Sequence, residues 1–113
     1  KSETEEKRLS DLTAAVQDAK TAAEFGIRRS QVEFYSAFSD QNLSAMKEVW
    51  STQPDVRCIH PGMPCLNGHE AVIQSWGQIF SNAPKFSIQP SRTRIDVCGQ
   101  TALCSCIEET SDG

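Results

Sequence analysis

The sequence contains no long apolar run, since its uninterrupted apolar stretches are only a few residues long. A helix that crosses a bilayer needs about 20 such residues, so no membrane span is predicted. An excess of basic charge is also lacking, because 15 acidic residues outnumber 11 basic ones and leave a net charge of −4. Proteins that bind nucleic acid by neutralising its phosphates carry the opposite sign, so we expect no nucleic-acid partner.

The cysteines lack the spacing of a zinc site, since none of the five forms a C-x₂₋₄-C pair. Tetrahedral zinc sites usually use such pairs, so we predict no metal, and no motif indicates a cofactor. Five is an odd number, which would leave one thiol over in a fully paired disulfide framework. We therefore expect reduced, buried thiols and an intracellular, reducing compartment, either the cytoplasm or the interior of an organelle.

The remaining composition is that of one folded domain. The chain has 113 residues, of which 38% are apolar and 23% are charged. It begins with Lys1 rather than Met and shows no apolar signal segment. We therefore expect a processed form or part of a longer chain.

Apolar residues recur every three to four positions from Leu9 to Phe38, which predicts a long amphipathic helix. Gly26 is the one candidate break, so the pattern allows one helix or two. The first half carries mostly alanine on its apolar side, a thin stripe better suited to a partner helix than to a thick core. We predict that residues 1–23 are a helical extension and that residues 24–113 are the domain proper.

A second helix is predicted over residues 43–50, with Ser39 or Asp40 as its cap and Pro54 beyond its end. The run from Val56 to His60 is typical of a strand, because it is closed by a Pro and Gly cluster. A loop through Cys65 and Leu66 should follow it.

A third helix is predicted from residue 67 or 68 to about residue 82, and everything after Lys85 is typical of strands. The apolar alternation changes phase along this segment, which indicates a bulge near Pro90. Gly99 and Gln100 suit a two-residue turn that pairs Cys98 with Thr101. Two long strands are fewer than a sheet usually contains, so we expect further strands beyond this chain.

That turn sorts the hairpin side chains onto two faces. The face expected to pack under helices holds Thr93, Ile95, Val97, Ala102, Cys104, Cys106 and Glu108. On the other face, apolar side chains stand among charged ones, as is common at protein interfaces. The predicted interface residues are Arg92, Arg94, Leu103 and Ile107.

Several segments, taken in order, carry a resemblance to a known family. They are Phe34-Tyr35-x-Ala37-Phe38-x-Asp40, Met46 to Trp50, Pro54-Asp55-Val56-x-Cys58-Ile59-His60-Pro61-Gly62, Gly68-x-x-Ala71-Val72-Ile73-x-Ser75-Trp76 and Ile95-x-Val97-x-Gly99-x-x-Ala102. The chain resembles the SnoaL-like branch of the nuclear transport factor 2-like superfamily from about residue 24 to residue 109. The resemblance implies an α+β cone, in which a curved, mostly antiparallel sheet wraps three helices around a pocket. Its last strands would be missing from this chain.

The superfamily includes isomerases, cyclases, dehydratases, kinase oligomerisation domains and cargo-binding proteins, so the fold alone predicts no reaction. The predicted pocket residues are Tyr35, Trp50, Arg57, His60, Trp76 and Glu108. For the two tryptophans we favour core packing over ligand stacking, and for His60 we favour a hydrogen bond to the loop backbone over a role as general base or ligand contact.

The resemblance transfers no catalytic residue. We therefore expect a non-catalytic accessory domain that serves protein–protein interaction or oligomerisation, as a homodimer, with another protein or within a larger assembly. The alternative is an isomerase-like or cyclase-like enzyme, or a binder of a small hydrophobic ligand, that uses the cone pocket.

Overall fold

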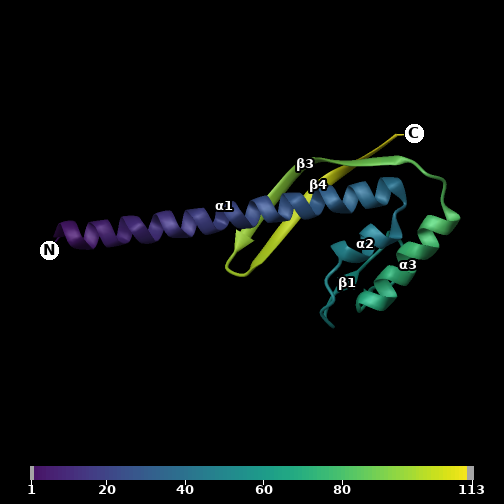
Figure 1. Cartoon of the computed structure of the whole chain (residues 1–113), viewed down its shortest axis with the longest axis horizontal. Coiled ribbons are helices and arrows are strands. Elements are labelled where there is room, and N and C mark those ends of the chain that lie inside the picture. Colours follow the sequence, from purple (N-terminus) through teal and green to yellow (C-terminus); the bar gives the residue numbers. More distant parts are fainter. Residues whose placement is uncertain (1, 112–113) are drawn as a thin grey trace.

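The computed structural model describes residues 2–111, which form an elongated molecule of 67 × 32 × 25 Å (Figure 1). Its elements are α1 (Ser2–Asp40), α2 (Leu43–Val49), β1 (Arg57–Cys58), β2 (Leu66–Asn67), α3 (His69–Asn82), β3 (Ser87–Cys98) and β4 (Thr101–Ser111). The predicted α+β class is confirmed. No helix among residues 2–111 has the length and apolar character needed to cross a membrane.

Helix α1 is one continuous helix of 39 residues, and Gly26 does not interrupt it. It ends at Asp40, and the next residue, Gln41, has a φ of +51°, in the left-handed region. The Asn42 N–H donates to the carbonyl of Ala37 at 2.9 Å, and the Gln41 N–H donates to that of Phe38 at 3.1 Å. These two bonds form a Schellman motif, which satisfies the last carbonyls of the helix.

The predicted cap of α2 is wrong. The cap is Asn42, whose side-chain oxygen accepts from the Ala45 N–H at 3.0 Å. Asp40 cannot cap α2 because it is still part of α1. The Ser39 hydroxyl instead bonds the N–H and the carbonyl of Ile88, at 2.9 and 3.0 Å, and so fastens the start of β3 to α1.

The segment after α2 differs from the prediction in one respect. The strand expected over residues 56–60 is reduced to β1, which pairs with β2 where a loop was expected. Helix α3 begins after Gly68, whose φ is +89°, and ends at Asn82, as predicted. Its start is fixed to the small sheet, because the Gly68 N–H donates to the Val56 carbonyl at 2.8 Å.

The hydrophobic core lies where the second half of α1 meets α2, β1 and α3. Its buried members are Ala37, Met46, Cys58, Val72 and Trp76. Phenylalanine rings from α1 and α3 pack around Trp76. This cluster sets the position of every aromatic side chain in the site described below.

Strands β3 and β4 form an antiparallel hairpin with the predicted register, in which Cys98 pairs with Thr101 and Ile95 with Cys104. The bulge is present but lies two residues beyond Pro90, at Arg92, which has a φ of +51°. Figure 1 shows the hairpin lying against the middle of α1. The hairpin face predicted to pack under helices therefore contacts α1.

Candidate functional site

A concavity of about 490 Å³ lies beside the core, between α1, β1 and its following loop, α3 and β4. It is lined by Phe34, Phe38, Trp50, Arg57, Cys58, Ile59, His60, Pro61, Trp76, Ile79 and Glu108. Most of these side chains are apolar or aromatic, and the polar groups are few. A pocket of this make-up can hold a small apolar molecule.

Trp76 forms the floor of the concavity and is only 4% exposed. Its ring meets those of Phe38 and His60 edge-on, with both ring centroids at 4.9 Å. Among the described residues, its indole Nε1 has no hydrogen-bond partner. A buried N–H without an acceptor is unusual in a folded protein.

His60 is held by a chain of two hydrogen bonds. Its Nε2 lies 2.9 Å from the Ser75 hydroxyl, and that hydroxyl donates to the Val72 carbonyl at 2.6 Å. Cys58 Sγ lies 3.7 Å from the same nitrogen. The imidazole is therefore oriented by α3 and β1.

Glu108 is paired with Tyr35. The Tyr35 hydroxyl donates to Glu108 Oε2 at 2.7 Å and lies 3.3 Å from Cys106 Sγ. Burial of the phenol, followed by its hydrogen bonds to Cys106 and Glu108, raises the pKa of Tyr35 above its ordinary value. Tyr35 therefore remains a neutral hydrogen-bond donor at physiological pH.

The remaining polar groups of the concavity have structural partners or face solvent. The Trp50 indole Nε1 donates to Met46 Sδ at 3.3 Å, which ties the ring to α2. Arg57 lies on β1, where it is paired with Asn67 of β2, and it is exposed. The described residues contain no cluster of three or more His, Cys, Asp or Glu side chains that could hold a metal ion.

Five of the six predicted pocket residues line this concavity: Trp50, Arg57, His60, Trp76 and Glu108. The sixth, Tyr35, is buried and reaches the concavity only through Glu108. Sequence reasoning missed Phe34, Phe38, Cys58, Ile59, Pro61 and Ile79 as lining residues. The spacing of Phe34 and Phe38, one helical turn apart, was the available signal for two of them.

The outer face of the hairpin, which points away from α1, carries the predicted interface residues. Leu103 is 68% exposed and Ile107 is 49% exposed. Arg92 and Arg94 are also exposed, and Arg94 bonds Asp96 at 3.0 Å. An apolar pair within a charged surround therefore lies open to solvent on this face.

The prediction of buried cysteines is wrong for most of the five. All five are free thiols, but Cys58 is the only buried one. Cys65 lies in a loop and Cys98 lies next to the hairpin turn, and both are exposed; on the hairpin face, Cys104 is exposed and Cys106 is half-buried. Gln31 of α1 approaches this face, and its amide lies 3.0 Å from the Thr93 hydroxyl and 3.8 Å from Cys104 Sγ.

Comparison with known proteins places these features in context. A family model described as the SnoaL-like domain matches residues 27–113. The curated F-box protein SKIP8 of Arabidopsis thaliana is 35% identical to this chain over 65 residues, which is 56% of this chain and 28% of that protein. The chain therefore spans about a quarter of the length of this relative.

Two solved structures share the fold. One is a candidate dehydratase of the NTF2-like family from Streptomyces avermitilis, with a TM-score of 0.68 and 27% identity. The other is a candidate calcium/calmodulin-dependent protein kinase type II association domain from Thiobacillus denitrificans, with a TM-score of 0.69 and 30% identity. Each match covers 74% of this chain and 67% of the solved chain.

Proposed function

The chain belongs to the SnoaL-like domain family, and on that premise we propose that it is a non-catalytic accessory domain that associates with proteins through the outer face of its hairpin. The observation that carries this proposal is the exposure of Leu103 and Ile107, at 68% and 49%. They lie on one strand, four residues apart, and therefore project from the same face. Apolar side chains surrounded by charge are typical of association surfaces.

The polar groups of the concavity support a role without catalysis. A base that abstracts a proton must be within reach of substrate, and an oxyanion requires convergent donors. Here the Tyr35 hydroxyl is bonded to Glu108, and His60 Nε2 is bonded to Ser75. Both groups are therefore engaged in contacts that stabilise the fold.

The names of two similar proteins agree with an association role. One solved neighbour is a candidate kinase association domain, and the curated relative is an F-box protein. Since the chain spans 28% of that relative, the shared segment is a module within a longer protein there.

Replacing Leu103 and Ile107 together by lysine tests the proposal. Sedimentation velocity of the wild type should show association, and the double variant should lose the part of that association that depends on the hairpin face, with an unchanged melting temperature. The matched control is the double variant Gln53→Lys and Gln78→Lys, which adds the same charge at exposed positions outside the hairpin. Equal association of the double variant and the wild type would refute the proposal.

A second candidate function is the binding of a small apolar molecule in the concavity. The observation that favours it is the Trp76 Nε1–H, which is buried and has no acceptor among the described residues. A ligand with an apolar body and a carbonyl could supply that acceptor.

Acetophenone is a suitable probe for this second candidate, and indole N–H signals in a ¹⁵N-correlated spectrum report its binding. The Trp76 signal, assigned with Trp76→Phe, should move further during the titration than the Trp50 signal, because the Trp50 N–H is already bonded to Met46. If neither signal moves, the concavity does not bind such a molecule.

A further inference from the structure

The first half of α1 projects beyond the rest of the molecule (Figure 1). Every residue from 3 to 22 is exposed. Three of these are large apolar residues: Leu9 is 64% exposed, Leu12 is 57% exposed and Val16 is 56% exposed. Isolated apolar residues on a surface are ordinary, but these three lie in a row.

The row follows the spacing of a coiled coil. Leu9, Leu12, Val16, Ala19 and Ala23 are separated alternately by three and four residues, so they occupy the a and d positions of successive heptads. We name these five residues the seam. Leu9, Leu12, Val16 and Ala19 lie in the exposed part of α1, and Ala23, at the end of the seam, is partly buried.

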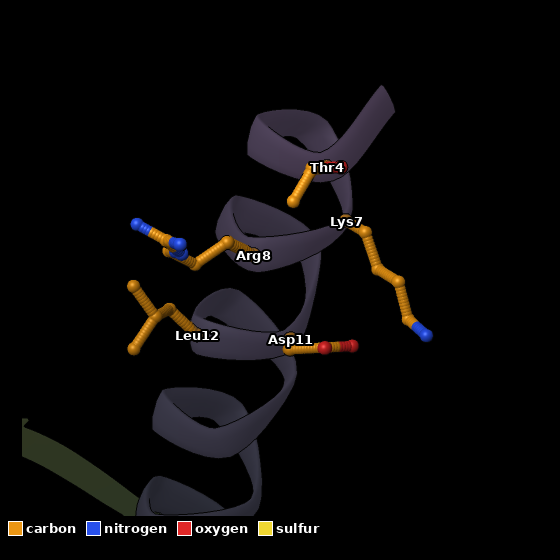
Figure 2. Close-up of a pocket in the computed structure, with 5 residues that line it drawn as sticks. All are labelled: Thr4, Lys7, Arg8, Asp11 and Leu12. Atoms are coloured by element: carbon orange, nitrogen blue, oxygen red, sulfur yellow. The ribbon is translucent and has the colours of Figure 1, made fainter. Parts of the chain in front are cut away.

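Figure 2 shows the surroundings of one seam residue, Leu12. Leu12 and Arg8 project from one side of the helix, whereas Lys7 and Asp11 project from the other. These four residues and Thr4 line a shallow hollow of about 380 Å³ that is formed by α1 alone. Arg8 therefore flanks the seam, and Lys7 lies away from it.

We propose that the seam binds the seam of a second copy of this chain, with the two helices antiparallel. In this arrangement Leu9 lies opposite Ala19 of the other copy, and Leu12 lies opposite Val16. Each layer then combines a larger side chain with a smaller one, which keeps the two helices evenly spaced along the contact. A parallel pair would instead taper from leucine–leucine layers to alanine–alanine layers.

Charge complementarity sets the same orientation and register. In antiparallel coiled coils, e positions face e positions of the other helix. Glu6 and Lys20 both occupy e positions, and in the proposed register each faces the other across the dimer, which gives two ion pairs by symmetry. Shifting the register by one heptad in one direction brings Arg8 toward Arg29, and shifting it in the other direction leaves Glu6 opposite an uncharged residue.

A parallel dimer is disfavoured by charge as well. Glu5 occupies the d position before Leu9, so a parallel pair would place the two copies of Glu5 against each other in the core. In the antiparallel pair Glu5 lies opposite Ala23. The contact from residue 5 to residue 23 is about 28 Å long, and it places the two domain bodies at opposite ends.

Charge reversal on the full chain tests both the contact and its orientation. Glu6→Lys and Lys20→Glu should each weaken dimerisation about tenfold in sedimentation equilibrium, because two ion pairs become two like-charge contacts. The double variant Glu6→Lys with Lys20→Glu should restore the wild-type dissociation constant, because the pairs are re-formed with opposite sign. In a parallel dimer these residues are about 21 Å apart along the axis, so reversal would have no such effect.

Two controls separate this surface from the hairpin face. Lys7→Glu reverses a charge away from the seam and should leave the dissociation constant unchanged. The charge series is repeated with Leu103 and Ile107 replaced by lysine, where α1 pairing should persist even if hairpin association is lost. The proposal is overturned if the wild type stays monomeric up to about 500 μM, or if the double charge reversal fails to restore what each single reversal removes.

Discussion

His60→Ala is the substitution that best separates a structural concavity from a working site. His60 is half-buried, forms a hydrogen bond of 2.9 Å with the Ser75 hydroxyl and meets the Trp76 ring at 4.9 Å between centroids. Alanine removes both contacts. It leaves the hydrogen bond from Ser75 to the Val72 carbonyl in place, so no buried donor is orphaned by the change.

The expected loss of unfolding free energy follows from these two contacts. A hydrogen bond of this kind contributes about 0.5–1.5 kcal/mol net. An edge-on aromatic pair contributes about 0.5–1.5 kcal/mol beyond its buried area. Together they predict a loss of about 1–3 kcal/mol, which is a large part of the stability of a domain of this size.

Urea unfolding of His60→Ala, Ser75→Ala and the double variant measures these losses of unfolding free energy. The double-mutant cycle should give a coupling of about 1 kcal/mol between the two side chains, since they share one hydrogen bond. His60→Phe, which keeps a ring against Trp76, should recover part of the loss. A His60→Ala protein that is as stable as the wild type but no longer responds to acetophenone would refute the structural role and make His60 a ligand-binding residue.

The other predictions concern the core, the thiols and the response to alkaline pH. Trp76→Ala should cost about 3–5 kcal/mol through its cavity in urea unfolding, and Trp76→Phe should cost clearly less, because the indole N–H has no acceptor to lose. Thiol labelling of the native protein should first modify the exposed cysteines Cys65, Cys98 and Cys104, and labelling of the denatured, unreduced protein should find all five free. Fewer than five would indicate a disulfide. Burial raises the pKa of Tyr35 and Cys58 above their ordinary values of 10.0 and 9.0, so the folded state holds these protons more tightly than the unfolded state. Their contribution to stability should be complete below pH 9.0 and should decline as the pH rises above it. Tyr35→Phe should make the stability curve flatter above pH 10.0, and an equally steep curve would contradict this assignment.

Local patterns predicted the hairpin and α3 well. A glycine at the first turn position fixes the pairing of the strands that flank it, and Gly99 indeed has a φ of +59°. The phase change of the apolar residues predicted the bulge. It could not place the bulge at Arg92, because no feature of an arginine indicates a left-handed backbone.

The cap of α2 and the pairing of β1 with β2 could not be predicted from residue types and spacing alone. Asn42 is as good a cap by residue type as Ser39 or Asp40, and the choice between them depends on how α1 terminates at Gln41. A strand pair of two residues each leaves too short an alternation to recognise.

A site residue could be predicted where its side chain is polar or aromatic and where the spacing along its helix or strand also directed it toward the interior. Trp50, His60 and Trp76 met that condition and line the concavity. Cys58 and Ile59 did not, because their position depends on how the small sheet packs against α3, a tertiary feature that residue spacing does not encode.

Because α1 continues through Gly26 without a break, its first half is a rigid extension of the domain and not a flexible linker. At 1.5 Å per residue, its 39 residues extend about 58 Å, and each residue turns the helix by about 100°. The number of residues between the seam and the core therefore sets the angle at which anything bound to the seam is presented to the concavity. Inserting one residue after Ala23 would swing that bound molecule about a quarter of the way around the axis, whereas inserting a full turn would return it nearly to its original bearing.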